Sequence, residues 1–235
     1  MPDLLWRHYG GGACGAAMNS APSPAAALQV LDTPEIVRRA AVAGLGARLN
    51  VAEAVRDIVH RLARSEAGDA ELAAVAQLLR EAGAVLEGQP EREGYVRSVE
   101  GALTGLGTLS ELGPFTGRLH PTSPQMDLLL GTDRAEARAT YGSVHQGAPG
   151  FVHGGYIAAT FDEMLGVVQR DTVRMTVELK LSYRAPVPLH EEVRYTSWLD
   201  RVEGRKAFVV GTLHHGDRLC AEATAVFVAP AKALF

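Results

Sequence analysis

The segment His153-Gly154-Gly155 carries residues whose types and spacing could do chemistry. A helix is predicted to begin near Gly154, and the two glycines leave backbone N–H groups uncovered in its first turn. These donors, together with the positive end of the helix dipole, favour an anion or a polarised carbonyl oxygen. A glycine pair also permits a tight turn that has no chemical role, so the pair alone is a weak indication of a site.

Asp162 is the sharper signal, because it lies about two helical turns beyond Gly155 and on nearly the same side of the predicted helix. An ionised carboxylate beside an apolar stripe is costly unless it faces water, a partner or a substrate. For any single Asp, a solvated surface position is the alternative. Glu163 competes for the same role, but it points about 100° further round the helix. We expect Glu163 to face solvent or an interface.

The distance between Gly155 and Asp162 constrains how the two could act together. Two helical turns separate them by roughly 10 Å along the helix axis. A single reacting carbonyl group needs contacts of about 3 Å to both. If both act, they come from two copies of the helix. An antiparallel pair about a two-fold axis would give two identical sites per dimer.

The elements that must position this segment indicate an α+β domain. One helix is predicted at about 154–169, and Glu203-Gly204 and Gly216-Asp217 are typical hairpin turns. The helix has an apolar stripe that we expect to pack on the sheet, formed by Ile157, Phe161, Met164, Leu165 and Val168. Strands are predicted at 126–130, 136–144, 174–184, 191–200, 206–214 and 218–228.

The chain divides into four predicted parts. Residues 1–31 are rich in Gly, Ala, Ser and Pro and predict a disordered tail. Residues 32–90 predict a helical hairpin whose first helix begins at Pro34, and residues 91–114 predict a linker. Residues 115–235 form the α+β domain. The hairpin holds no candidate catalytic residue, and we interpret it as a packing or oligomerisation arm.

Composition and charge argue against several classes of protein. The 235 residues carry a net charge of −4 without a basic block, which disfavours binding to a nucleic-acid backbone. No apolar run has the length of a membrane span, and no secretory signal is recognised. Two cysteines, Cys14 and Cys220, make neither a disulfide framework nor a metal site. We therefore expect a cytoplasmic protein that uses no metal or other cofactor.

Residues 147–166, with His153-Gly154-Gly155 and Asp162 nine positions after the histidine, resemble hotdog-fold thioesterases of the phenylacetate-pathway (PaaI) type. They also resemble the mitochondrial thioesterase-superfamily members. The agreement continues in order through Met175-Thr176, 183–189 and 200–206, and it covers most of 115–229. The resemblance implies a hotdog fold, in which an antiparallel sheet wraps a central helix. It also implies self-association as a homodimer or as a dimer of dimers.

The resemblance implies a role for each site residue. The Gly155 N–H polarises a thioester carbonyl, Asp162 from the partner subunit activates water or attacks directly, and Thr176 holds the water or the carboxylate. By strand alternation Thr176 falls on the polar face, so its role rests on the resemblance alone. His153 supports the turn or bonds the carbonyl. The remaining candidates would bind substrate. Gln146 and Gly154 would lie near the thioester, and Arg184, Arg205 and Lys206 would contact the phosphates of coenzyme A. For each of these three charged side chains taken singly, a solvated surface position is the more common role.

The function that follows from the resemblance is hydrolysis of an acyl thioester, with acyl-CoA as the expected substrate. A thioester of an acyl-carrier protein or of a biosynthetic intermediate is the alternative within this class. A hotdog module that binds an acyl ligand without catalysis is the non-enzymatic alternative, since fold does not determine function. The intact set of His153, Gly155, Asp162 and Thr176 favours an enzyme. The motif of hotdog dehydratases, a His with a distant acid, is not found.

Overall fold

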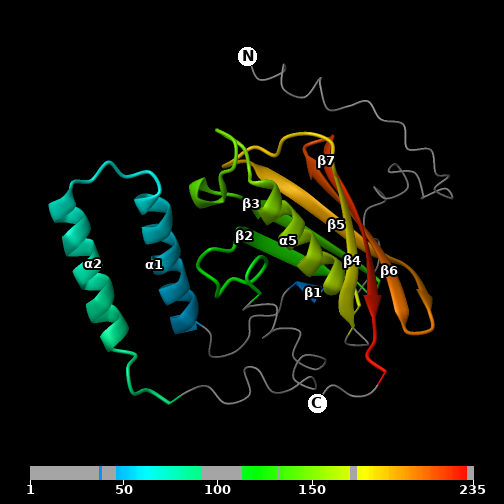
Figure 1. Cartoon of the computed structure of the whole chain (residues 1–235), viewed down its shortest axis with the longest axis horizontal. Coiled ribbons are helices and arrows are strands. Elements are labelled where there is room, and N and C mark those ends of the chain that lie inside the picture. The colour runs from blue at the N-terminus through cyan, green and yellow to red at the C-terminus, as the bar shows by residue number, and fades with distance from the viewer. Residues whose placement is uncertain (1–36, 39–45, 91–112, 132, 170–173, 232–235) are drawn as a thin grey trace. The chain divides into compact units, whose positions relative to one another are not determined.

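The computed structural model describes residues 37–38, 46–90, 113–131, 133–169 and 174–231 (Figure 1). Its described strands form one antiparallel sheet of seven strands in the order β1-β2-β3-β5-β6-β7-β4. The strands are β1 Val37–Arg38, β2 Gln125–Leu130, β3 Arg134–Thr140, β4 Met175–Tyr183, β5 Glu192–Glu203, β6 Lys206–His215 and β7 Arg218–Val228. The helices are α1 Gly46–Leu62, α2 Asp69–Ala84, the short 3-10 helix η1 Ser143–His145, and α5 Gly154–Gly166.

Helix α5 lies across one face of this sheet (Figure 1). Its predicted apolar stripe is confirmed, because all five of its side chains are at most 4% exposed. Gly211 of β6 allows the close approach, since a Cβ there would lie 3.0 Å from Leu165 Cδ2 and 3.2 Å from Phe161 Cε1. Alanines occupy many other buried sheet positions, among them Ala135, Ala137, Ala139, Ala221, Ala223 and Ala225. These small residues make room for the large side chains of the helix.

Buried hydroxyl groups fix the rotation of α5 against the sheet. Tyr141 Oη donates to Thr160 Oγ1 at 3.0 Å and lies 2.6 Å from Tyr195 Oη. Ser197 Oγ donates to the Met164 carbonyl at 2.8 Å. Burial raises the pKa of Tyr141 to about 12, so this hydroxyl stays protonated and hydrogen-bonded. The helix that carries Asp162 is therefore held by directional bonds as well as by apolar packing.

Strand β4 follows α5 in the chain but pairs with the last strand, β7, at one end of the strand order. Among the described strands it has no second neighbour, so one of its edges is unpaired. Met175 and Val177 are 57% and 61% exposed, and Tyr183 is 41% exposed. An unpaired edge with exposed apolar side chains is a template for pairing with another chain.

The predicted helical hairpin differs from the structure at its start. Val37–Arg38 pair with β2 as a short strand, so a helix that begins at Pro34 is wrong for these residues. Helix α1 begins instead at Gly46, where glycine interrupts the apolar pattern. The predicted tail 1–31 lies outside the described residues, as does the predicted linker apart from Gly113 and Pro114.

The two helices of this region differ in how they pack. Helix α1 buries Ala52 and Arg56, which are 4% and 8% exposed. Helix α2 buries no residue, and its apolar positions Leu72, Val75 and Leu79 are 37–42% exposed. Only α1 therefore meets the expectation that this region packs on another part of the chain.

None of the helices in the described segments combines the length and apolar character that a membrane crossing requires.

Candidate active site

The first turn of α5 is held by the side chain of His153. This residue is the N-cap of the helix, and its Nδ1 accepts the Gly155 N–H at 2.9 Å. The approach to the helix is also fixed, because the His153 N–H donates to the His145 carbonyl at 2.8 Å. Gly147 has no room for a side chain, since a Cβ there would lie 2.8 Å from His153 Cα. In this conformation the Gly155 N–H, which is predicted to polarise a carbonyl, is hydrogen-bonded to the exposed imidazole of His153.

Capping by His153 leads to a stability prediction. We expect His153→Ala to lower the free energy of unfolding by about 1 kcal/mol, because it removes the acceptor of a first-turn N–H. Urea unfolding followed by circular dichroism measures the change. His153→Asn is the matched control, since Asn supplies an acceptor at an N-cap and should recover most of the loss. Equal stability of the Ala variant and the wild type would contradict a capping role.

Tyr183 at the end of β4 is a site residue that the sequence analysis missed. Its hydroxyl donates to the Gly154 carbonyl at 2.7 Å. A Cβ on Gly154 would lie 3.0 Å from this hydroxyl, so the glycine permits the approach. Partial burial raises the pKa of Tyr183. We call His153, Gly154, Gly155 and Tyr183 the Gly155 half-site.

Asp162 lies on α5 about two turns further along, at the edge of the buried stripe. The residue is partly exposed, but its Oδ1 is buried and has no hydrogen-bond partner in the described structure. A buried carboxylate oxygen without a partner is costly, and it is the kind of group that a substrate, water or second subunit satisfies. The side chain is not used to hold the fold together, which leaves it available for chemistry.

Glu163 has a different environment from the one expected. The prediction that it faces solvent is wrong for its carboxylate, which is bonded within the chain, and the alternative of an interface stays a prediction. Its Oε1 accepts the Phe115 N–H at 3.2 Å, and its Oε2 accepts the Thr116 hydroxyl at 2.6 Å. Burial raises the pKa of Glu163, and these hydrogen bonds oppose that shift. Helical periodicity could not reveal this contact, since its partners lie 47 and 48 residues away.

Thr176 and Asp162 lie toward the same end of the sheet. Thr176 of β4 is opposite Phe227 of β7, beside an irregularity in the strand register. A Cβ on Gly166, one turn beyond Asp162, would lie 3.9 Å from the Phe227 ring. No hydrogen bond joins Thr176 to Asp162 within the described chain. We call Asp162 and Thr176 the Asp162 half-site.

The two half-sites lie at opposite ends of α5 and β4. The Gly155 half-site joins the beginning of α5 to the end of β4, through the bond between Tyr183 and Gly154. The Asp162 half-site is near the end of α5 and the beginning of β4. One protomer therefore does not bring Gly155 and Asp162 to one reacting carbonyl, as the helix geometry predicted.

The predicted phosphate-binding residues also lie near opposite ends of β7. The Arg184 N–H donates to the Cys220 carbonyl near the start of β7, whereas Arg205 Nη1 donates to the Ala229 carbonyl beyond its end. These two points are about 30 Å apart along an extended strand. Arg184 and the adjacent pair Arg205 and Lys206 therefore do not form one phosphate site in a single protomer.

Arg184 and Gln146 already have partners within the chain. Arg184 forms an ion pair with Glu222 of β7, and its Nε donates to Glu222 Oε1 at 3.0 Å. The Gln146 Oε1 accepts the Gly150 N–H at 3.4 Å, which leaves its amide nitrogen as the group that could meet a substrate. In the described residues, no three His, Cys, Asp or Glu side chains are grouped as metal ligands.

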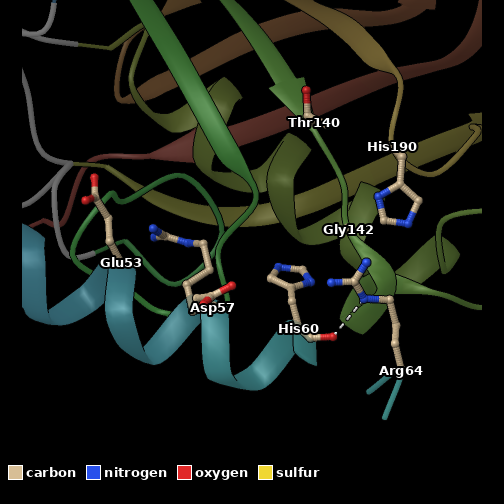
Figure 2. A pocket seen from close by; sticks show the side chains of 8 residues that line it. Glu53, Asp57, His60, Arg64, Thr140, Gly142 and His190 are labelled. Carbon is tan, nitrogen blue, oxygen red and sulfur yellow. Dashed lines mark hydrogen bonds between the residues drawn. The ribbon is translucent and has the colours of Figure 1, made fainter. Parts of the chain in front are cut away.

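A cavity of about 280 Å³ lies elsewhere, between α1 and the turn that follows β3 (Figure 2). His60 of α1 and Arg64, just beyond the end of α1, face Gly142 and His190 across it (Figure 2). None of the predicted site residues lines this cavity. Its arginines, Arg56 and Arg64, are balanced by the carboxylates Glu53 and Asp57. This charge balance gives no preference for an anion, and we do not assign the cavity a ligand.

Comparison with known proteins identifies a thioesterase family and curated thioesterases as relatives of this chain. Residues 149–222 match the thioesterase superfamily. Acyl-coenzyme A thioesterase THEM4 of Mus musculus is 44% identical over 91 residues, which are 37% of this chain and 40% of that protein. The protein of the same name from Xenopus laevis is 33% identical over 122 residues, which are 48% of this chain and 55% of that protein. The matches thus span about half or less of these curated relatives.

A crystal structure described as a thioesterase superfamily protein resembles most of the chain. Its TM-score is 0.73 at 28% sequence identity, and the match covers 84% of this chain and 98% of that one. Together the matches confirm the hotdog fold and the resemblance inferred from the sequence. The superfamily match includes both half-sites and begins after Gln146.

Proposed function

Because the chain folds as a hotdog domain whose residues 149–222 are those of the thioesterase superfamily, we propose that it hydrolyses acyl thioesters at sites shared by two subunits. The observation that carries this proposal is the position of the two half-sites at opposite ends of α5 and β4. Two-fold symmetry converts such an arrangement into two complete sites, since each subunit's Gly155 half-site meets the partner's Asp162 half-site.

The unpaired edge of β4 is the surface by which we propose that two subunits pair. If two copies of β4 align antiparallel around Leu179, Met175 of one strand lies opposite Tyr183 of the other. The exposed apolar side chains of both strands are then covered, and the open edge of the sheet is closed. The same alignment places the Thr176 end of one subunit beside the Tyr183 end of its partner.

The proposed chemistry uses the Gly155 N–H of one subunit and the Asp162 carboxylate of its partner. The thioester carbonyl accepts the Gly155 N–H once the exposed His153 ring has turned away, and the helix dipole stabilises the oxyanion that forms. Asp162 of the partner subunit takes a proton from water as the water oxygen attacks the carbonyl carbon. The C–S bond then breaks, and the leaving thiolate accepts a proton. Direct attack by the carboxylate, which gives an acyl anhydride that water opens, is the second route.

Acyl-CoA is the proposed substrate, because the curated relatives are named acyl-coenzyme A thioesterases. In the paired arrangement Arg184 of one subunit approaches Arg205 and Lys206 of the other, which would gather positive charge for the phosphates of coenzyme A. A carrier-protein thioester would present a single phosphate instead. A cytoplasmic location belongs to the same proposal, and it fits the free thiol of buried Cys220.

A thiol-release assay tests the proposed function. We expect the purified protein to release coenzyme A from one or more members of a series of acyl-CoA esters of increasing chain length and aromatic character. The same assay with acyl-carrier protein thioesters distinguishes the two substrate classes. Absence of thiol release from every ester, combined with measurable binding of an acyl-CoA, would favour the non-catalytic acyl-binding module instead.

A further inference from the structure

We infer that Glu163 and Arg56 clamp one loop at two places, so that helix α1, outside the matched thioesterase region, helps to position Asp162. The loop comprises residues 113–123, and we call it the bridging loop. Glu163 and Arg56 are positioning residues in this inference, since they act through the loop and not on a substrate. The inference rests on the proposed function for its effect on turnover, but the clamp itself can be tested separately.

The bridging loop is attached to α5 at two points on one side of the helix. Glu163 accepts hydrogen bonds from the loop, among them one from the Phe115 N–H and one from the Thr116 hydroxyl. The Phe115 ring packs edge-on against Tyr156, with ring centroids 6.0 Å apart. Tyr156 and Glu163 are two helical turns apart, so Phe115 and Thr116 together contact two successive parts of α5. Gly113 lets it approach closely, because a Cβ there would lie 2.6 Å from Glu163 Oε2.

The middle of the bridging loop is attached to α1. Arg56 is 8% exposed, and its Nη2 donates to the Arg118 carbonyl at 2.9 Å and to the His120 carbonyl at 3.0 Å. The loop presents both carbonyls because it is braced internally, with Ser123 Oγ also donating to the His120 carbonyl at 3.0 Å. A buried guanidinium that binds two carbonyls is difficult to replace with any other side chain.

Aromatic contacts join the same two helices by a second route. The His145 ring lies edge-on to His60 of α1, with centroids 5.6 Å apart, and to Tyr156 of α5, with centroids 4.7 Å apart. His145 Nε2 also lies 2.9 Å from the Thr122 carbonyl of the bridging loop. Helix α1, the loop and α5 therefore form one packed unit.

The consequence for catalysis follows from the position of Glu163 beside Asp162. Bonds from the sheet side, such as Ser197 Oγ to the Met164 carbonyl, hold one face of this turn of α5. The bridging loop holds it from another side through Glu163. Loss of the loop would allow Asp162 to move relative to the partner's Gly155. A displacement of about 1 Å in a reacting group can cost on the order of 100-fold in rate.

Three variants and one control test the clamp in the full-length protein. We expect Arg56→Ala and Glu163→Ala each to lower kcat about tenfold while KM changes less than about twofold, because alignment is lost and binding groups are kept. Glu163→Gln should rescue kcat, since its amide oxygen can accept the Phe115 N–H and its NH₂ can donate to Thr116. Arg61→Ala is the matched control on α1, because Arg61 is exposed and pairs with the exposed Asp57 one helical turn away.

Hydrogen exchange provides a readout that does not depend on activity. We expect amide exchange in residues 113–123 to rise in Arg56→Ala and Glu163→Ala, and to stay unchanged in Arg61→Ala and Glu163→Gln. If no thioester is hydrolysed by any form of the protein, this pattern still supports the clamp while the proposed function fails. The double variant should lose less activity than the product of the single losses, because both changes release the same loop.

Two outcomes would overturn the inference. One is wild-type kcat together with unchanged exchange in folded Arg56→Ala and Glu163→Ala. The other is an equal loss in Glu163→Ala and Glu163→Gln, which would mean that the charge of Glu163 and not its bonds to the loop is what matters. If Glu163→Ala does not fold, Thr116→Val removes the hydroxyl that donates to Glu163 with nearly the same side-chain volume, and a lower kcat is again expected.

Discussion

Replacement of Asp162 by Asn is expected to lower the kcat of thioester hydrolysis by about 10²–10⁴-fold, the usual contribution of a general base. Asn keeps the size of the side chain but cannot take a proton from water or form an acyl anhydride. The fold should survive, because Asp162 Oδ1 has no partner in the described chain. Removal of a partly buried charge without a partner should not lower the unfolding temperature. Thiol release at saturating substrate measures the loss.

Asp217→Asn is the matched control for this result. Asp217 lies in the exposed turn between β6 and β7 and belongs to neither half-site, so the same chemical change there should leave kcat unaltered. Thermal unfolding and light scattering of both variants verify that fold and assembly are preserved. Near-normal hydrolysis by folded Asp162→Asn would reject Asp162 as base or nucleophile.

Most of the sheet and the central helix could be predicted from local sequence patterns. Helix α5 shows its buried stripe in the spacing of Ile157, Phe161 and Leu165, and the hairpins after β5 and β6 are marked by Gly204 and Gly216, both with positive φ. The place of β4 beside β7 could not be predicted in this way, because strand pairing depends on contacts far apart in sequence.

The start of α1 was predicted wrongly for a related reason. Apolar residues recur at near-helical spacing from Ile36 onward, and they favour a helix when considered alone. Val37–Arg38 instead pair with Leu129 and Leu130 of β2, so tertiary hydrogen bonding overrides the local preference. Gly46 then marks the beginning of the helix.

In the candidate site, too, local sequence patterns predict some features and miss those that depend on residues far apart in the chain. The separation of Gly155 from Asp162 follows from helix geometry, and it is the reason why a site shared by two subunits is proposed. The partners of Arg184 and Glu163 could not be found by spacing, since Glu222 lies 38 residues from Arg184 and Thr116 lies 47 residues from Glu163. The Tyr183 bond to Gly154 was missed because the two residues are 29 positions apart and no local pattern links them.

Mixing two inactive variants is expected to restore activity if two subunits share each site. Asp162→Ala removes the proposed base, and Gly155→Pro removes the backbone N–H that would bind the carbonyl. Neither homodimer contains a site with both groups. In a heterodimer, one of the two sites receives an intact Gly155 and an intact Asp162. Random exchange makes about half of the dimers mixed, so about a quarter of wild-type activity should return.

The control for this experiment is Gly155→Ala, which adds a side chain but keeps the N–H. A Cβ on Gly155 would lie 3.0 Å from His153 Nδ1, and the exposed imidazole can turn aside to accept it. Gly155→Ala should therefore retain far more activity than Gly155→Pro. Because a helix tolerates proline only in its first turn, circular dichroism verifies that the Gly155→Pro variant folds. Subunits labelled with two different tags establish that mixed dimers have formed. Mixed dimers as inactive as either parent would mean that Gly155 and Asp162 do not meet across the interface, since the heterodimer then contains a complete pair that does nothing.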